Sequence, residues 1–381
     1  MQKASLETQQ PKKVALINVA VAVIHYGERY LLGFRNAAQH QGNLYEFVGG
    51  KIEPDERAEQ ALIREVAEET GISLNNNMLV KLGRLHHDYG DKHVSLQVYK
   101  IELTDKQFEY YKHHSHGLEG QALTWVYKSQ LLAGQYPLPA ANKTILDWLS
   151  VPTKIAITHP LAHFEGQSDP ESAWLQYHQE KLPPDSWSYI RVKHSDTNHF
   201  TKQLLDTRPD ILAIVPHDNN NGLSFSHPSE TGTVKPINPN VVAKHLTHSD
   251  LLAWLDSTQT AHSIAHTLVN PLGHSNNAEA LPTDCPLIVS CHDVPSIEAA
   301  NQLAKARLHH KLPPVIGAFL SPVLPTQTHP DTPPLGWEAW ADLAELADMP
   351  VIGLGGLSPA MAGDILPYGG IGVAGICQFH Q

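Results

Sequence analysis

A run of glycines and carboxylates between residues 50 and 72 constrains this 381-residue chain more than any other feature. Glu65, Glu68 and Glu69 stand at positions i, i+3 and i+4, so on a helix their carboxylates share one face. Carboxylates packed this closely repel one another unless a hard, oxygen-preferring cation such as Mg²⁺ or Mn²⁺ lies among them. The segment therefore predicts a metal-binding helix near residues 56–70.

The residues that flank this helix favour a built site over the alternative, a solvated acidic helix face. Pro54-Asp55 is a helix start signal, and Gly71 is a stop signal. Glu56 and Arg64 are spaced to orient the metal-binding carboxylates from a second layer of contacts. The full pattern is Gly50, five residues, Glu56, seven residues, Arg64-Glu65-Val66, one residue, Glu68-Glu69, one residue and Gly71-Ile72.

This pattern resembles the Nudix box at every fixed position. In that family the box carries metal ions that polarise a pyrophosphate and activate water. The resemblance implies that Glu65, Glu68 and Glu69 are metal ligands and catalytic residues, and that Arg64 assists them. It also implies a further ligand, the backbone carbonyl of Gly49, and Mg²⁺ as the cofactor with Mn²⁺ as the alternative.

The flanking segments 44–53, 91–96 and 138–142 resemble MutT-type Nudix enzymes, with Val48 in place of the usual proline. Those enzymes hydrolyse oxidised purine nucleoside triphosphates such as 8-oxo-dGTP. The resemblance implies that Asn142 reads the oxidised base, since an amide offers both a donor and an acceptor. The alternative for Asn142 is an ordinary helix N-cap. The expected substrate-binding residues are Arg35, Phe47, Lys51 and Asn142.

The expected reaction is attack of water on the phosphoanhydride, which releases a nucleoside monophosphate and pyrophosphate. Such an enzyme would remove oxidised precursors from the nucleotide pool and so limit mutation. Glu119 falls where the MutT-type enzymes have a glutamate that helps to bind metal and is a candidate base. Three residues remain candidates for the general base: Glu65, Glu69 and Glu119.

The hydrophobic pattern predicts an α/β chain in two parts. Segments 14–24 and 30–34 alternate around a turn at Gly27-Glu28 and predict a hairpin. Further strands are expected at 79–85, 94–103 and 123–126, and a helix at 142–149. From Lys154 onward, short apolar runs alternate with helix-compatible stretches, which is typical of an α/β barrel. We expect a Nudix α/β/α sandwich over residues 1–150 and a (β/α)8 TIM barrel over 153–381, joined by the linker 150–153.

The second part resembles thiamine-phosphate synthase and its TenI relatives over residues 154–379. The resemblance is carried by segments 189–193, 290–292, 320–329, 351–357 and 372–376. Loops after the last strands of such barrels often bind phosphate on backbone amides. The expected barrel phosphate site comprises Arg191, Lys193, His292, Thr326, Thr328, Gly355 and Gly356.

The departures from that family lie at its metal-binding and phosphate-binding positions. Thr158-His159 replaces Thr-Asp, and His329 replaces a lysine. Segments 216–219 and 224–230 do not reproduce the family's acidic ligands. We therefore expect a barrel that binds a phosphate ligand without synthase activity. Two alternatives stay open: an active synthase fused to a hydrolase of thiamine-pathway diphosphates, and a phosphate-ligand sensor that regulates the hydrolase.

Composition narrows the function classes. A formal charge of −12 argues against polymeric nucleic acid as a partner, although a metal ion can still bring a small anionic nucleotide to the chain. No run approaches the roughly 20 apolar residues of a membrane helix. Residues 1–13 are polar and lack a signal-peptide core, which favours the cytoplasm. The three cysteines have no metal-ligand spacing and predict neither a disulfide framework nor a zinc site. Nothing in the pattern indicates a protein partner.

Overall fold

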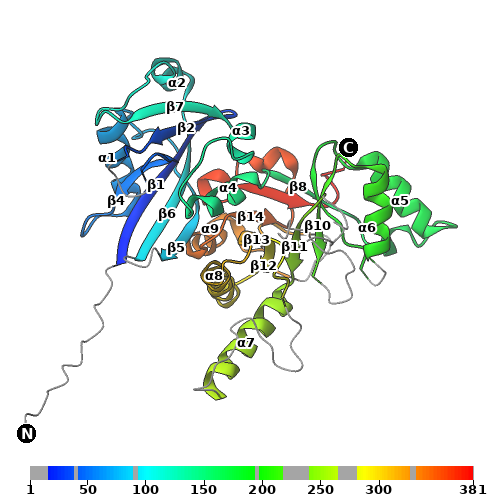
Figure 1. Cartoon of the computed structure of the whole chain (residues 1–381). Helices are drawn as coiled ribbons and strands as arrows, with labels where there is room; N and C mark the ends of the chain where they lie inside the picture. The colour runs from blue at the N-terminus through cyan, green and yellow to red at the C-terminus, as the bar shows by residue number, and fades with distance from the viewer. Residues whose placement is uncertain are drawn as a thin grey trace, which may run out of the picture.

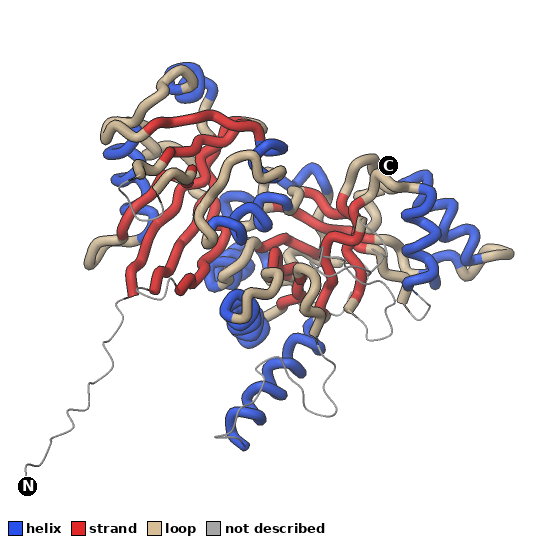
Figure 2. The backbone as a smooth tube through the Cα atoms, viewed as in Figure 1, coloured by secondary structure: helices blue, strands red, loops and turns tan. Residues whose placement is uncertain are grey.

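The computed structural model describes residues 16–37, 42–88, 93–193, 197–217, 240–264, 281–326 and 332–380. Two β-structures lie side by side in Figures 1 and 2: a seven-stranded sheet and a closed barrel of eight strands. The barrel strands are all parallel, and helices surround them. The expected combination of an α/β sandwich and a TIM-type barrel is confirmed.

The first sheet is mixed, with β1 at its centre. Its path is β3-β2-β1-β6-β5, and β4 and β7 pair with β1 and β2. β1 and β2 form the expected antiparallel hairpin, whereas β1 and β6 run parallel. The strands are β1 Leu16–Tyr26, β2 Arg29–Phe34, β3 Tyr45–Glu46, β4 Val48–Lys51, β5 Val80–Asp88, β6 His93–Glu102 and β7 Ala122–Tyr127.

Strand β1 is buried on both faces, and successive side chains enter different cores. Ala20, Ala22 and Ile24 pack with helix α1 (Ala58–Thr70) in one apolar cluster. Val21 and Val23 pack in another cluster, which contains helix α4 (Asn142–Ser150) and side chains of the barrel. This is the two-residue period of a strand with both faces covered. Accordingly, α1 lies on the outer side of the sheet and α4 lies between the sheet and the barrel (Figure 1).

The barrel closes in the order β10-β11-β12-β13-β14-β15-β8-β9. Its strands are β8 Lys154–Ile157, β9 Trp187–Tyr189, β10 Leu212–Pro216, β11 Val241–Leu246, β12 Leu287–Cys291, β13 Val315–Leu320, β14 Val351–Leu354 and β15 Gly372–Gly375. Helices α5 Pro170–Lys181, α6 Thr197–Thr207, α7 His248–Ile264, α8 Val294–His309 and α9 Gly336–Leu346 accompany them. The first unit also contains α2 Asp105–Tyr111 and α3 Lys128–Leu132.

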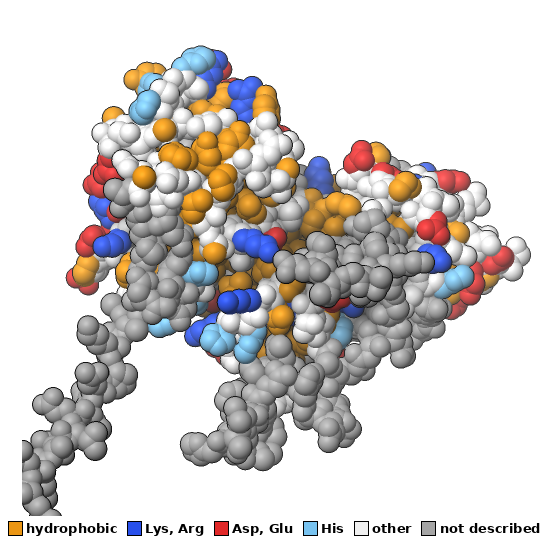
Figure 3. Space-filling model, viewed as in Figure 1, with side chains coloured by type: hydrophobic (Ala, Val, Ile, Leu, Met, Phe, Trp, Pro, Cys, Tyr) orange, Lys and Arg blue, Asp and Glu red, His pale blue; other side chains and the backbone are white. Residues whose placement is uncertain are grey.

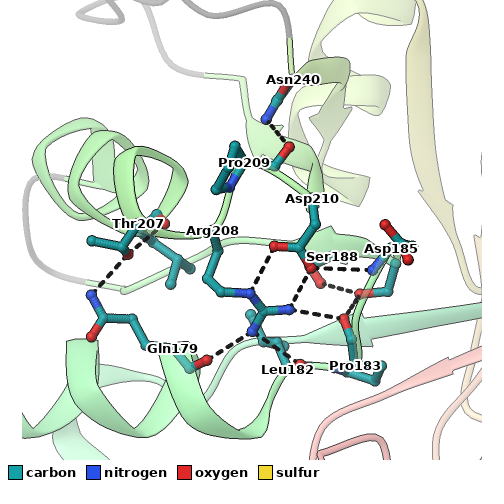
Figure 4. Close-up of polar contacts among 12 residues, drawn as sticks. Gln179, Leu182, Pro183, Asp185, Ser188, Thr207, Arg208, Pro209, Asp210 and Asn240 are labelled. Carbon is teal, nitrogen blue, oxygen red and sulfur yellow. Dashed lines mark hydrogen bonds and ion pairs between the residues drawn. The ribbon is translucent and has the colours of Figure 1, made fainter.

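Arg208 joins the early strands and helices of the barrel (Figure 4). Its guanidinium pairs with both carboxylate oxygens of Asp210, at 2.8 and 2.7 Å. It also donates to the backbone carbonyls of Gln179, Leu182 and Pro183, which end α5 and begin the approach to β9. One planar cation thereby satisfies carbonyls that the end of a helix leaves unpaired.

One element boundary differs from the sequence expectation. The helix of the Nudix-like pattern begins at Ala58 and not near Glu56, because Asp55 has a positive φ of 66° and Glu56 N–H closes a turn onto the Glu53 carbonyl. Strand β9 ends at Tyr189, so the segment 190–193 leaves the barrel as a loop. The helix expected at 142–149 is confirmed as α4. The domain boundary at 150–153 stays a prediction.

Helices of the described segments are too short or too polar to cross a lipid bilayer.

Candidate active site

Two glycines of β4 allow the carboxylate helix α1 to approach the sheet. β4 pairs antiparallel with β1, which sets Gly49 opposite Val21 and Gly50 opposite Ala20. A β-carbon on Gly50 would lie 2.0 Å from the carboxyl carbon of Glu65. One on Gly49 would lie 2.1 Å from the Ala20 carbonyl oxygen. The Glu65 carboxylate therefore occupies space that only glycine leaves open at position 50.

Arg64 organises three carboxylates of the same segment. Its Nε and Nη2 donate to the two oxygens of Glu56 at 3.0 and 2.9 Å. Its Nη1 donates to Glu65 at 2.8 Å and to Glu68 at 3.2 Å. These bonds to Arg64 come first among the causes that hold the pKa of Glu56 below its usual range. Arg64 is thus bonded to three carboxylates of this segment, and its predicted role in orienting metal ligands stays a prediction.

Backbone groups of the loop before α1 join the same hydrogen-bond network. Arg64 Nη2 donates to the Lys51 carbonyl at 3.1 Å, and the Glu53 N–H donates to Glu56 at 3.1 Å. The Lys51 side chain is exposed beside this network. The loop between β4 and α1 is therefore fixed by the same arginine that holds Glu65 and Glu68.

Glu69 lies in the most crowded part of the site. Burial, followed by the negative charges of Glu46, Glu119 and Glu65, raises the pKa of Glu69 to about 8. A hydrogen bond from the Gly49 N–H acts in the opposite direction. Here the structure shows the Gly49 amide turned to a carboxylate; the predicted role of its carbonyl as a metal ligand stays a prediction.

The loop that carries Glu119 is docked on the end of helix α1. Leu118 N–H and the side-chain amide of Gln121 both donate to the Glu69 carbonyl, at 2.7 and 3.1 Å. Gly120 has a positive φ of 83°, which turns the chain at this point. Glu119 is exposed, and its charge reaches Glu69. The loop thus brings a residue 50 positions away in the chain next to the carboxylate helix.

The side chains fit an oxygen-preferring divalent cation. Like charges crowded beside Glu69 are stabilised by a cation, and carboxylates are the ligands that Mg²⁺ prefers. Within the described segments no group of three or more His, Cys, Asp or Glu residues is close enough to ligate one ion together. Arg64 instead draws Glu65 and Glu68 to itself. The ligand roles of Glu65, Glu68 and Glu69 stay predictions.

Glu46 links Arg35 to the carboxylates, and sequence reasoning had missed Glu46. Arg35 Nε donates to Glu46 at 2.5 Å, and both side chains are about 30% exposed. Burial raises the pKa of Glu46, and the Arg35 charge offsets part of that rise. Glu46 lies in the 44–53 stretch that suggested the MutT-type resemblance, so its position just before the glycine strand β4 was the available signal.

Phe47 and Asn142 lie on the inner side of the sheet. Phe47 is 4% exposed and belongs to the same apolar cluster as Ala141 and Ile145 of α4. Asn142 is 8% exposed and is the first residue of α4, whose N-cap is Ala141. The N-cap alternative for Asn142 is therefore wrong: no side-chain bond caps this helix. The base-reading role of its amide stays a prediction.

The expected barrel site is described only in part. Arg191 follows β9, and its guanidinium carbon lies 5.7 Å from the centre of the Tyr189 ring. Lys193 has a positive φ of 50° in the same loop. His292 follows β12, and its Nδ1 lies 2.8 Å from the Ser321 carbonyl oxygen. Thr326 is half-buried at the end of a described segment, whereas Thr328 lies outside the described residues.

Packing of two barrel loops explains why glycine stands at positions 355 and 356, which are also candidates for phosphate binding. Both have positive φ values, 98° and 70°. β-Carbons there would lie 2.8 Å from Pro322 and 2.6 Å from the Pro325 carbonyl oxygen. The loop after β14 therefore packs directly on the loop after β13.

Of the departures from the thiamine-phosphate synthase pattern, residues 218–219, 224–230 and 329 lie outside the described residues.

Inside the barrel, a polar chain crosses the core. Tyr189 Oη lies 2.9 Å from Nδ1 of His245, and Nε2 of His245 lies 2.8 Å from Oγ of Ser290. Burial lowers the pKa of His245 to about 3. Sequence reasoning missed this chain, because its three members come from three separate strands.

Comparisons with known proteins agree with this geometry. Residues 19–148 match the family model described as NUDIX domain. The chain is 34% identical to the CTP pyrophosphohydrolase of Escherichia coli (strain K12), across 35% of this chain and 90% of that protein. The chain belongs to the Nudix family. The predicted resemblance is thus confirmed, and the first unit is a pyrophosphohydrolase of a family that uses divalent metal ions and small-molecule substrates.

Two further Nudix relatives are named 8-oxo-dGTP diphosphatases. The 8-oxo-dGTP diphosphatase of Escherichia coli (strain K12) is 31% identical over 34% of this chain and 93% of its own length. The 8-oxo-dGTP diphosphatase of Haemophilus influenzae is 37% identical over 34% and 89%. Residues 278–379 match the model described as Thiamine monophosphate synthase, which covers the barrel from before β12 to the end of β15.

Proposed function

We propose that the chain hydrolyses oxidised purine nucleoside triphosphates, with 8-oxo-dGTP as the type substrate and Mg²⁺ as the ion. The products are the nucleoside monophosphate and pyrophosphate. The observation that carries the proposal is the crowding of Glu46, Glu65 and Glu119 around Glu69, beside the glycine turn of β4. Two relatives named 8-oxo-dGTP diphosphatases, each covered over most of its length, support the choice of base.

The residues of this chain divide the work of the hydrolysis. Glu65, Glu68 and Glu69 would hold Mg²⁺, which would neutralise charge on the pyrophosphate and orient the attacking water. Arg64 holds Glu65 and Glu68 in place, and the Gly49 N–H holds Glu69. Water oxygen bonds to phosphorus, the anhydride P–O bond breaks, and a carboxylate accepts the water proton. The pyrophosphate leaves as an anion, so no covalent enzyme intermediate is needed.

Glu65, Glu69 and Glu119 are the candidates for that proton acceptor. Glu65 is engaged by Arg64, and Glu119 is exposed at the edge of the site. Burial and neighbouring carboxylates raise the pKa of Glu69 to about 8 without a bound cation, and a cation among these carboxylates would lower it again. All three residues therefore stay candidates for the base.

Selection of the base is assigned to the inner side of the sheet. The Asn142 amide can donate and accept at once, and Phe47 offers an apolar ring in the cluster that contains Ala141 and Ile145. A base that leaves the amide unpaired would be bound less well. We assign nucleotide contacts to Arg35, whose Nε donates to Glu46, and to Lys51, whose side chain is exposed.

A second candidate substrate is CTP, because a relative with that activity in its name is covered over 90% of its length. The thiamine-pathway alternative is supported by the family match of the barrel and not by any feature of the first unit. For the barrel itself we propose a phosphate-ligand site at Arg191, Lys193 and the loops after β12, β13 and β14.

A panel assay tests the substrate. Purified full-length protein is given 8-oxo-dGTP, dGTP, CTP and thiamine diphosphate, and kcat/KM is measured for each. The proposal expects the highest kcat/KM for 8-oxo-dGTP. A higher value for CTP or for thiamine diphosphate would replace it with the corresponding alternative.

The ion is tested on the same protein after treatment with a chelator. Hydrolysis should stop and return when Mg²⁺ is added, with Mn²⁺ as the parallel sample. Full activity in the chelator-treated sample would contradict the metal assignment.

A further inference from the structure

The helix that begins with Asn142 is fastened to the barrel two turns later. Trp148 of α4 is 3% exposed, and its indole Nε1 donates to the carbonyl of Val315 at 3.1 Å. Val315 is the first residue of barrel strand β13. Trp148 follows Asn142 by six positions of the helix, about 9 Å along the axis. The proposed base reader and the barrel anchor are therefore the two ends of one short rigid element (Figure 1).

Strand β5 packs directly on Trp148 at Gly83, which has no side chain to separate them. A β-carbon on Gly83 would lie 2.9 Å from the Trp148 ring and 2.6 Å from the carbonyl oxygen of Asp348. The next residue, Arg84, donates its backbone N–H to that same carbonyl at 3.2 Å. The first sheet, α4 and the segment between α9 and β14 thus meet at one point.

Charged groups at the same junction tie the sheet to the barrel. The Lys81 side chain is 7% exposed and donates to the backbone carbonyl and the carboxylate of Glu345, at the end of α9. Arg84 Nε lies 3.6 Å from Asp348 Oδ1. Asp348 N–H donates in turn to Asn301 of α8 at 2.8 Å. A buried ammonium such as that of Lys81 is costly to separate from its partners, so the junction resists sliding.

The apolar cluster runs without a break from the proposed base pocket to the barrel. Phe47, Ile145, Trp148 and Ile316 of β13 all belong to it. Protein interiors are close-packed, so a shift of Trp148 must be taken up by its neighbours along this path. Asn142 lies at the far end of the same helix.

We propose that Trp148 is a positioning residue for base recognition, and that the barrel wall at Val315 is the surface against which it positions Asn142. The inference rests on the proposed role of Asn142. In this arrangement the barrel is a structural part of the nucleotide site, in addition to any ligand that it binds. Substrate affinity then depends on the barrel, whereas the carboxylate chemistry on the outer side of the sheet does not.

The test compares the full-length variants Trp148→Phe and Lys143→Ala. The first keeps an aromatic ring but loses the donor to Val315, and the second removes an exposed side chain of the same helix. For Trp148→Phe we expect KM for 8-oxo-dGTP to rise about 5- to 10-fold with kcat changed less than about twofold, as one lost buried hydrogen bond allows. Lys143→Ala should change neither parameter.

A barrel-side variant and a double-mutant cycle keep the inference falsifiable if Trp148→Phe does not fold. Asn301→Ala changes a barrel residue: it removes the acceptor for the Asp348 N–H and the donor to the Leu346 carbonyl, and should raise KM in the same way by about two- to threefold. In the cycle, Asn142→Ala should mask the effect of the junction variant on KM, because both act on one interaction.

The outcomes separate the two proposals. If the wild type shows no preference for 8-oxo-dGTP over dGTP, the proposed substrate is wrong. If that preference is present but folded Trp148→Phe and Asn301→Ala keep the wild-type KM, or lower kcat at unchanged KM, the positioning inference is overturned alone.

Discussion

Around Glu69 the first unit gathers carboxylates from three segments, whereas the described carboxyl ends of the barrel strands carry imidazoles, hydroxyls and glycines. His159 follows β8, His292 follows β12, and the glycine pair follows β14. Asp293, next to His292, is already engaged as the N-cap of α8, where it accepts from Ser296 N–H at 2.9 Å. Figure 3 shows acidic side chains at the outer edge of the first unit.

The difference separates two kinds of chemistry. Carboxylates that crowd one another require a cation, and a cation with water is what phosphoanhydride hydrolysis needs. Imidazoles and backbone amides can bind a phosphate, but they do not assemble a magnesium site as readily as carboxylates do. We therefore expect hydrolysis to depend on the first unit and binding of a phosphate ligand to depend on the barrel.

The largest effect is expected from Glu69→Gln, which removes a charge but keeps the shape of the side chain. If the carboxylates of the first unit carry the chemistry, kcat should fall about 1,000-fold, within the range for loss of a group in proton transfer. Steady-state kinetics with saturating Mg²⁺ measures the change.

Glu109→Gln is the matched control, because Glu109 is exposed on α2 and its carboxylate pairs with Lys112, away from the carboxylate helix. It should keep the wild-type kcat. Activity of Glu69→Gln within tenfold of the wild type would place the chemistry elsewhere and remove the contrast between the units.

The second effect is a loss of stability in acid, to which two buried histidines of the barrel contribute. His178 is fully buried, and its Nε2 accepts the His159 N–H at 3.0 Å, which requires an unprotonated nitrogen. Burial lowers the pKa of His178 and of His245 to about 3. Both values lie below the usual 6.5, so the stability is complete above pH 6.5 and is lost as the pH falls below it. Each histidine should cost about 1.4 kcal/mol per pH unit.

Urea unfolding at several pH values between 7 and 4.5 measures this loss, followed by a probe in each unit. His178→Gln should reduce the dependence on pH, whereas His309→Gln, at an exposed position of α8, should not. An unfolding free energy that stays constant down to pH 4.5 would show that these imidazoles are not held neutral.

A third effect concerns specificity. Asn142→Ala should lower the preference for 8-oxo-dGTP over dGTP by about 30-fold, since an unmatched polar group at a base costs roughly 1–3 kcal/mol. The measurement is the ratio of the two kcat/KM values. Hydrolysis of both nucleotides should continue, because the carboxylates are untouched. An unchanged ratio would return Asn142 to a purely structural role.

The smallest effect is expected in the barrel. Arg191→Gln should weaken binding of thiamine monophosphate about 10-fold, as expected for the loss of a charge-assisted contact to phosphate. Calorimetric titration of the full-length protein gives the affinity, and Lys202→Gln, at an exposed position of α6, is the control. If the wild type does not bind the ligand, the barrel loses its proposed phosphate site and the contrast between the units becomes sharper.

The sequence carried most of the local information about the first unit. Spacing alone predicted that Arg64 orients its neighbours, and the structure shows it bonded to Glu56, Glu65 and Glu68. Spacing could not reveal Glu46, because its proximity to Glu69 arises from strand pairing and not from a helical period. The helix start was misplaced by two residues, since the signals at Pro54-Asp55 open a turn before the helix begins.

The relation between the units could not be predicted from periodicity. Gly83 and Trp148 belong to no motif in the sequence, and their contact with Asp348 and Val315 depends on the arrangement of two sheets. The chain Tyr189–His245–Ser290 likewise requires the register of the closed barrel. Local patterns specify elements, whereas contacts between distant elements depend on how the faces pack.

Alternate residues of strand β1 lie in two different cores, and this arrangement limits how the first unit can be grafted onto another protein. Ala20, Ala22 and Ile24 meet a helix of the same unit, so a transplanted first unit would bring its own partner for that face. Val21 and Val23 share a core with barrel side chains such as Ile316, and that partner would be left behind. Chimeras that graft this unit onto another scaffold should therefore need redesign at the odd-numbered positions of the strand and tolerate its even-numbered positions as they are.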